Sequence, residues 1–270
     1  MELANVHRTT LPNGLTVLIQ EDHSAPVVAI VTYVKAGYFD ETDVENGLAH
    51  ALEHMFFKGT QRRGVGDIAK ETKASGGYLN AHTIYDNTAY FTVLPSSGFA
   101  RGLDIQADAY ANSIIDAREL GREMEVIIQE AKRKSDNPSA VATETLYELL
   151  YDKHRMRRWR IGREPGLRAF TREMMNGFYR NFYKPSNTIL SISGDVDPAD
   201  ALGAGDGNDV ASPREEPRQR ELGRRAPLLL CDLLHPANEI QIPAKVLALE
   251  SGVVPARVIL GQIRLAPEPA

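Results

Sequence analysis

Two histidines and a glutamate between residues 47 and 57 have a spacing that suits metal chemistry. They stand in the order His50-x-x-Glu53-His54. Residues three and four positions apart lie on the same side of an α-helix, so the three side chains would project from one face. Two imidazoles at this spacing can bind one Zn²⁺, and the glutamate would lie next to the open coordination position. There it can take a proton from a water whose pKa the metal lowers to about 7, which predicts metal-assisted hydrolysis.

The same residues also fit a different structure. They would form the polar face of an amphipathic helix whose other face packs into a core, through Leu48, Leu52, Met55 and Phe56. Both readings share the same helix. A five-residue pattern does not decide between them, and a third ligand is needed.

A helix predicted over residues 117–134 supplies a candidate for that ligand. Glu123 and Glu130 are seven residues apart, which is close to two helical turns, so they share a face. Apolar residues of the same helix are predicted to pack inward: Val126, Ile127 and Ala131. A carboxylate near a packed region is unfavourable unless it is paired or binds a metal. The alternative is a solvated face formed by Glu123, Glu125 and Glu130.

The remaining pattern predicts strands and helices in groups. Strands are expected as a hairpin over 9–20 and as runs at 27–35, 78–85, 87–94 and 187–193. Helices are expected around His50 and at 66–73, 99–112, 117–134, 140–151 and 170–183, with a loop at 155–163. Asn46 or Asp43 is the expected cap of the His50 helix, and Pro138 is expected to interrupt the chain between two helices. This grouping predicts an α+β fold, a largely antiparallel sheet with helices packed on one face.

Composition narrows the class of protein. The chain has 270 residues, 43% hydrophobic and 25% charged, and a net charge of −5 with both signs interspersed, so no nucleic-acid partner is expected. No run of 18 uncharged apolar residues exists, so no membrane association is expected. The first residues lack a basic leader with an apolar segment, and the single cysteine, Cys231, fits a reducing compartment. A cytoplasmic location is therefore expected.

Several ordered motifs together resemble the pitrilysin/insulinase family of zinc metallopeptidases, whose His-x-x-Glu-His order is the inverzincin motif. The closest form is the processing-peptidase-like bacterial members. The resemblance runs from about residue 7 to 200. Besides the histidine motif and Glu130, it rests on Asn13-Gly14-Leu15, Phe57-Lys58-Gly59-Thr60, Gly76 to Ala81, Asn137-Pro138, Tyr183 to Asn187 and Gly194-Asp195.

The resemblance implies a role for each matching residue. His50, His54 and Glu130 would hold the zinc, and Glu53 would be the general base. Glu123 would support the catalytic site without binding the metal itself, by orienting the first histidine or tuning the metal. The strand that carries Asn80 and Ala81 would bind a peptide or unfolded protein substrate by adding its backbone to the sheet edge.

The resemblance ends near residue 201. We therefore expect a zinc metallopeptidase domain over 1–200, a flexible glycine-rich linker over 201–225, and a proline-broken tail over 226–270 that we do not assign. Full-length members of the family carry a second homologous half, which closes over the substrate and adds an arginine–tyrosine pair. This chain shows no counterpart, which fits a half-length subunit, a truncated product or a divergent end.

Two functional hypotheses follow. The first is a zinc-dependent endopeptidase that hydrolyses peptide bonds through a metal-activated water. The second is a catalytically weak zinc-binding subunit that needs a partner carrying the missing half. The intact motif with Glu53 favours the first hypothesis, because a scaffold needs no general base. The missing half favours the second.

Overall fold

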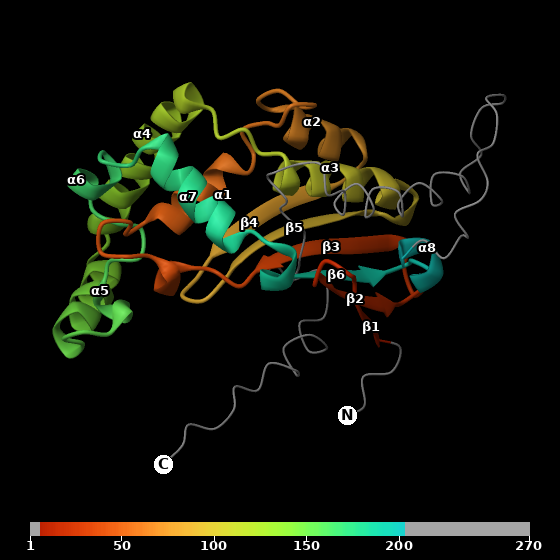
Figure 1. Ribbon diagram of the computed structural model, residues 1–270, viewed down its shortest axis with the longest axis horizontal. Coiled ribbons are helices and arrows are strands. Elements are labelled where there is room, and N and C mark those ends of the chain that lie inside the picture. The colour runs from red at the N-terminus through yellow and green to blue at the C-terminus, as the bar shows by residue number, and fades with distance from the viewer. Residues whose placement is uncertain (1–5, 203–270) are drawn as a thin grey trace, which may run out of the picture.

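The computed structural model describes residues 6–202 of the chain, which form one mixed sheet with helices packed against it (Figure 1). The sheet order is β1-β2-β6-β3-β5-β4. Its strands are β1 (Val6–Thr10), β2 (Thr16–Glu21), β3 (Val27–Val34), β4 (Tyr78–Thr83), β5 (Thr88–Pro95) and β6 (Thr188–Gly194). Every neighbouring pair is antiparallel except β2 and β6, which are parallel. The predicted α+β class with a largely antiparallel sheet is confirmed.

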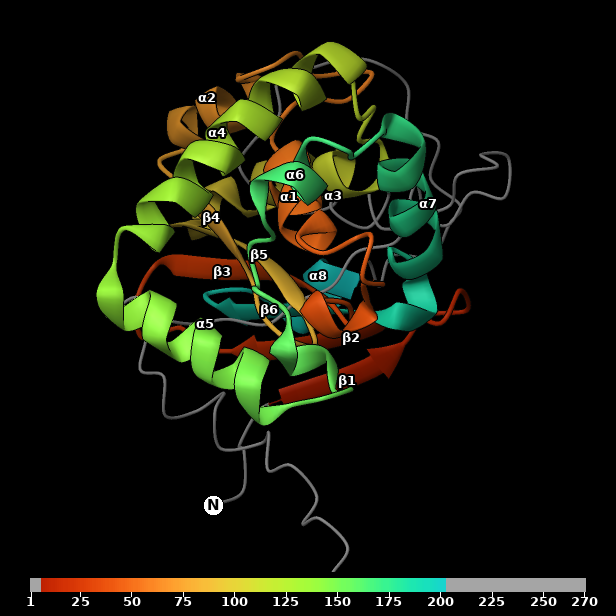
Figure 2. The same ribbon diagram turned by 90° about the vertical axis from the view of Figure 1, so that its left-hand side faces the viewer.

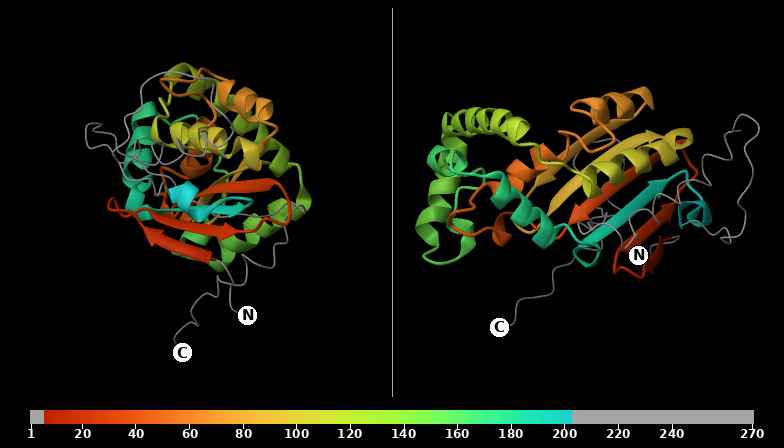
Figure 3. Two further views of the ribbon diagram at one scale, coloured as in Figure 1. Left: turned by 90° about the vertical axis from the view of Figure 1, so that its right-hand side faces the viewer. Right: turned by 45° about the horizontal axis from the view of Figure 1, so that its top comes forward.

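The helices gather over one side of the sheet and beyond one of its ends. Figures 1 and 3 show α1, α2, α3 and α7 over the sheet, and Figure 2 looks at the end where α1, α4, α5 and α6 lie. The helices are α1 (Leu48–Met55), α2 (Asp67–Ala74), α3 (Phe99–Ala111), α4 (Ala117–Ser135), α5 (Pro138–Leu150), α6 (Glu164–Leu167), α7 (Arg172–Phe182) and α8 (Pro198–Leu202). Short 3₁₀ turns are η1 (Tyr38–Asp40), η2 (Ser96–Gly98), η3 (Arg155–Arg157) and η4 (Pro185–Asn187).

The two predicted antiparallel pairs form as expected. β1 and β2 are joined by the turn that contains Gly14, whose φ of 89° is a conformation that glycine adopts at little cost. β4 and β5 pair through the short loop at 84–87, with Thr83 opposite Thr88. The β4–β5 hairpin forms the far edge of the sheet, because β4 is the last strand in its order.

The core lies between the sheet and its helices. Ile30, Leu94 and Leu103 are almost fully buried where α3 covers β3 and β5. Gly102 permits this close approach, because a Cβ there would lie 2.7 Å from a methyl carbon of Leu94. A second buried cluster surrounds α1 and includes Leu48, Leu52, Met55 and Phe56. α1 is thus amphipathic as predicted, and its apolar face fixes the direction in which its polar face points.

Several local predictions were wrong. Pro138 opens α5 instead of preceding it, because Asn137 caps the helix by accepting from the N–H of Ala140 at 3.1 Å and proline suits the first turn. The short α6 was not predicted. Val126 was expected to pack inward, yet 47% of it is exposed, whereas Ile127 and Ala131 are buried.

Of the linker and tail predicted after residue 200, the structure describes only residues 201 and 202. α8 runs to Leu202, so residues 201 and 202, where the predicted linker begins, are helical. The rest of that linker, the tail over 226–270 and Cys231 lie outside the described residues. Within residues 6–202, no helix is both long and apolar enough to cross a bilayer.

Candidate metal centre

Helix α1 begins at a backbone position that differs from the prediction. Neither Asn46 nor Asp43 caps it; the cap position is Gly47, whose φ is 99°. A Cβ at Gly47 would lie 2.5 Å from the carbonyl oxygen of Ile161, so glycine is required there for space as well as for conformation. Asn46 instead donates to the carbonyl of Trp159 at 2.8 Å. The first turn of α1 is thereby packed against the loop that leads to α6.

Glu41 satisfies the free N–H groups at the start of α1. Its two carboxyl oxygens accept from the N–H of Gly47 at 3.0 Å and of Ala49 at 2.9 Å. Burial raises the pKa of Glu41 to about 8, although these backbone donors act to lower it. Sequence reasoning missed this residue, because a carboxylate six residues before the cap position of a helix follows no capping pattern. Glu41 fixes the start of the helix that carries both histidines.

The structure brings His50, His54 and Glu130 together. Nε2 of His50 and Nε2 of His54 each lie 3.8 Å from Oε2 of Glu130, which comes from α4. One possible ligand atom from each of the three residues lies within 4.8 Å of the others. Two lone pairs and a carboxylate oxygen that converge in this way repel one another unless a cation lies between them. This arrangement favours the metal site over a solvated polar face.

The protonation of His50 also fits a metal ligand. Burial, together with the charges of His54 and Lys134, lowers the pKa of His50 to about 3, so the ring is neutral at neutral pH. Its buried Nδ1 has no hydrogen-bond partner among the described residues. A neutral imidazole is the form that binds zinc, and the nitrogen of His50 that faces the cluster is Nε2.

Glu123 supports the second histidine, not the first. Its Oε2 lies 3.0 Å from Nδ1 of His54, and its Oε1 lies 2.5 Å from Nζ of Lys58. Burial alone would raise the pKa of Glu123, but the bonds from Lys58 and His54 outweigh it and hold the pKa below its usual value. A carboxylate at this place keeps the proton of His54 on Nδ1, which leaves Nε2 free to face Glu130.

Glu53 lies beside the cluster and points toward the sheet. Its Oε2 accepts a hydrogen bond from the hydroxyl of Thr83, on β4, at 2.5 Å. Burial raises the pKa of Glu53 to about 7; the Thr83 bond opposes the rise and the charge of Glu130 adds to it. A carboxylate with a pKa near neutrality suits a general base. Sequence reasoning missed Thr83, although it lies two residues beyond Ala81 and so on the same strand face.

The strand that carries Asn80 and Ala81 is the edge strand β4. The N–H of Ile84 donates to the carbonyl of Asn87 at 2.8 Å, which closes the β4–β5 hairpin. From that pair, the alternation of an antiparallel ladder turns the backbone groups of residues 79, 81 and 83 away from β5. The N–H of Ala81 accordingly bonds to the side-chain oxygen of Asn80 at 2.9 Å, and the Asn80 amide donates to the Tyr78 hydroxyl at 2.7 Å. β4 therefore presents backbone donors and acceptors at the sheet edge next to α1.

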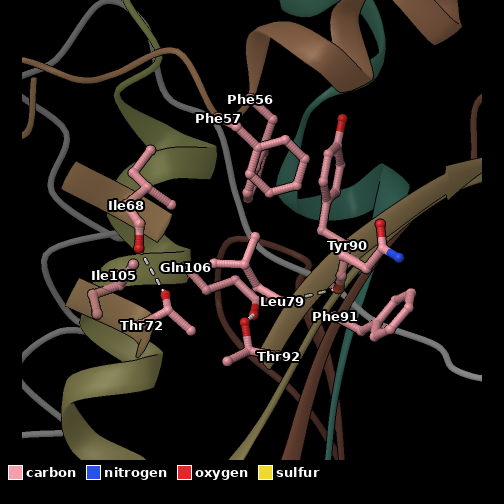
Figure 4. Close-up of a pocket in the computed structure, with 11 residues that line it drawn as sticks. Phe56, Phe57, Ile68, Thr72, Leu79, Tyr90, Phe91, Thr92, Ile105 and Gln106 are labelled. Atoms are coloured by element: carbon pink, nitrogen blue, oxygen red, sulfur yellow. Dashed lines mark hydrogen bonds between the residues drawn. The ribbon is translucent and has the colours of Figure 1, made fainter. Parts of the chain in front are cut away.

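Two hollows lie near this centre. One has a volume of about 240 Å³ and borders the histidine cluster, with a lining of Tyr38, His50, Glu130, Lys134, Arg160 and Ile161. The other is shown in Figure 4, where Phe56 and Phe57 lie against Tyr90, and Leu79 and Phe91 also line the space. Its volume is about 10 Å³, which is close to the space of a single water, so it is a well-packed apolar region.

A comparison with models of protein families identifies the family of the chain. The family model described as Insulinase (Peptidase family M16) matches residues 16–163, a span that includes both histidines, Glu53, Glu123 and Glu130. The chain belongs to this family. The insulinase-family match covers β2 through the loop before α6 and thus most of the described fold.

Individual relatives agree with the family. A zinc protease of Rickettsia felis is 36% identical over 193 residues, which cover 72% of this chain and 47% of the relative. A probable mitochondrial-processing peptidase subunit beta of Arabidopsis thaliana is 32% identical over 188 residues, which cover 70% of this chain and 35% of the relative. A protease from Helicobacter pylori has a solved structure that matches with a TM-score of 0.69 and 27% identity, over 72% of this chain and 47% of that one. This insulinase-family chain spans about half or less of the length of these relatives.

The residues of the cluster fit the metal that the bacterial relative's name gives. Two imidazoles and one carboxylate are a ligand set found in catalytic zinc sites, where a fourth position stays open for water or substrate. The neutral His50, the bond from His54 to Glu123 and the convergence on one Glu130 oxygen all suit Zn²⁺. Zn²⁺ is therefore the cofactor supported for this insulinase-family chain.

Proposed function

We propose that this chain is the metal-binding half of a zinc-dependent endopeptidase. The observation that carries the proposal is the convergence of His50, His54 and Glu130 next to a half-buried Glu53. An open strand edge lies on the other side of Glu53. A metal site, a base and a backbone-binding edge are the three parts that peptide hydrolysis needs.

The substrate is an extended peptide or an unfolded protein segment. It would add to β4 as a further strand, through the backbone groups of residues 79, 81 and 83, so that affinity does not depend on a particular sequence. For this to happen the side chain of Asn80 must release the N–H of Ala81. The peptide would then lie beside Glu53, because Thr83 on the same strand contacts that carboxylate.

Each residue near the scissile peptide bond has a separate proposed role. His50, His54 and Glu130 would hold Zn²⁺, which supplies Lewis-acid activation of water and of the peptide carbonyl. Glu53 takes the proton of the attacking water and passes it to the leaving nitrogen. Thr83 holds the Glu53 carboxylate in place, and Glu123 holds His54 in the ring orientation and tautomer that binding requires.

A second candidate function is a zinc-binding subunit that needs a partner for catalysis. The chain spans less than half of the Rickettsia and Arabidopsis relatives, and the Arabidopsis relative is named as a subunit. The β4 edge and the histidine cluster lie open on the described half, with no second wall to enclose a peptide within residues 6–202. We propose that a second peptidase-like half, or a subunit that carries one, completes the site.

Cleavage of a peptide blocked at both ends tests the proposed function. A zinc-loaded sample should cleave such a peptide internally, and a chelator should stop the reaction. Glu53→Gln keeps the shape but removes the base, so it should retain zinc and lower the rate by at least about 10²-fold. Glu125→Gln is the matched control, because Glu125 is an exposed residue paired with Arg168. Equal rates for Glu53→Gln and the wild type would disprove the assignment of the base.

A further inference from the structure

The hollow beside the metal centre carries positive groups that the proposed mechanism does not use. Lys134 of α4 and Arg160, from the loop after η3, line it together with the cluster residues His50 and Glu130. Its volume of about 240 Å³ is many times the roughly 10–15 Å³ that is needed, on the same measure, to hold one water molecule. It is therefore large enough to receive part of a substrate next to the reacting bond.

Both cations share one buried carboxylate. Glu144 of α5 is 1% exposed and accepts from Nζ of Lys134 at 2.6 Å and from Nε of Arg160 at 2.9 Å. The backbone N–H of Arg160 also points to Glu144, at 3.3 Å. Two positive charges against one negative charge leave a net positive charge on this wall. Glu130, one helical turn before Lys134 on α4, also lines the hollow, but its carboxylate faces the two histidines and, in the proposed function, binds the metal.

Arg160 has hydrogen-bond donors to spare. It uses Nε for Glu144, and its two terminal nitrogens have no hydrogen-bond partner within the described residues. Its guanidinium carbon lies 5.7 Å from the ring centre of Tyr85, which holds the side chain in place from one side. The hydroxyl of Tyr38, on the same hollow, also lacks a hydrogen-bond partner in the part of the chain that the structure describes. A planar fork of unpaired N–H groups fits a carboxylate.

We propose that this hollow binds a carboxylate of the substrate close to the scissile bond, through Arg160, with Lys134 and Tyr38 at its sides. The carboxylate belongs to an aspartate or glutamate side chain or to the free C-terminus of the peptide. This specificity rests on the proposed peptidase function, because the peptide must lie along β4 and the metal centre. It predicts that the chain selects peptides by an acidic group at one fixed position.

Peptide binding to the zinc-loaded Glu53→Gln variant tests this without turnover. Fluorescent peptides are prepared in pairs that differ by aspartate against asparagine at one position, scanned along the sequence, and by a free against an amidated C-terminus. Anisotropy gives Kd for each pair. One acidic position or the free terminus should bind about tenfold tighter than its neutral partner, the size of one hydrogen bond between charged groups.

The pocket variant then locates the effect. Arg160→Gln, made in the same background, should abolish the acidic preference while the Kd of the neutral peptides stays the same. Arg163→Gln is the matched control, because Arg163 is 57% exposed and pairs with Glu148 outside the hollow. Zinc content and the thermal unfolding curve establish that each variant is folded.

The outcomes separate this inference from the proposed function. Equal Kd values for acidic and neutral peptides at every position, and for free and amidated termini, would overturn the inference while leaving the peptidase intact. This comparison needs no pocket variant, so it decides the matter even if Arg160→Gln does not fold. An acidic preference that survives in a folded Arg160→Gln would also overturn it. Failure of every peptide to bind would overturn the proposed function and this inference together.

Discussion

The hydroxyl of Thr83 donates a hydrogen bond to Oε2 of Glu53, at a distance of 2.5 Å. This bond joins the edge strand β4 to the helix α1 at the residue proposed as the general base. The backbone groups of β4 and the carboxylate of Glu53 are therefore held at a fixed separation. Once the Asn80 side chain has released the N–H of Ala81, a peptide that pairs with β4 would meet the base.

Thr83 is accordingly expected to position Glu53. Thr83→Val keeps the shape of the side chain and removes the donor, so the rate of peptide cleavage should fall about tenfold or more while KM and zinc content change little. Thr83→Ser keeps the hydroxyl and should restore most of the rate. A Thr83→Val variant that cleaves as fast as wild type would show that the bond has no role in orienting the base.

Glu123 is expected to govern metal affinity through His54. Glu123→Gln weakens the acceptor at Nδ1 of His54 and the ion pair with Lys58, so zinc should bind about 10- to 100-fold more weakly. Competition with a chromogenic chelator measures this affinity. Glu125→Gln on the same helix is the control, and it should bind zinc like the wild type. If both variants hold zinc equally well, Glu123 has no part in supporting the site.

The buried ion pairs of Glu144 predict a dependence of stability on pH. Burial would raise the pKa of Glu144, but Lys134 and Arg160 outweigh it and keep the pKa below the usual 4.5. In the unfolded chain the pKa returns to about 4.5, so the unfolded state takes up the proton first as the pH falls. This contribution to the free energy of unfolding is complete above about pH 4.5 and is lost as the pH falls through the lower folded pKa.

Urea unfolding at several pH values between about 6 and 3.5 measures that loss. The free energy of unfolding should fall more steeply with acid in the wild type than in Glu144→Gln. Glu148→Gln, which alters an exposed pair with Arg163, should follow the wild-type slope. Parallel curves for Glu144→Gln and the wild type would contradict the prediction.

The isolated chain is expected to bind zinc well and to cleave peptides weakly. We expect residues 6–202 alone to lack a second set of donors for the transition state, and the loss of one such donor lowers a rate by roughly 10²–10³. Adding a chain that carries a second peptidase-like half should raise the rate, and size-exclusion chromatography should show the two chains eluting together. Rapid, chelator-sensitive cleavage by the purified monomer would contradict this prediction.

The parts of the fold that follow from local sequence were predicted well. Alternating and β-branched residues located the strands, and the spacing of apolar residues located α1, α3, α4 and α7. The parallel pairing of β2 with β6 could not be predicted from the sequence, because it joins segments about 170 residues apart and has no local sequence pattern. The start of α1 was misjudged for a similar reason, since Gly47 is required by its contact with the distant Ile161.

In the candidate site, too, the features set by local sequence were predicted and those set by distant contacts were not. His50, Glu53 and His54 stand on one helical turn, so their spacing was readable, and the family resemblance pointed to Glu130. Which histidine Glu123 supports depends on how α4 packs against α1, and sequence spacing did not fix that. Glu41 and Thr83 were missed because their roles arise from contacts with backbone groups and with a second element. Arg160 was placed only within the predicted loop at 155–163, without a role.

Zinc content, measured by elemental analysis of purified variants, tests the central claim most directly. The wild type and Glu53→Gln should each contain about one zinc per chain, because the base is not a ligand. His50→Ala, His54→Ala and Glu130→Ala should each lose it, and removing zinc from the wild type with a chelator should lower its Tm. A folded His54→Ala variant that keeps one zinc per chain would contradict the account.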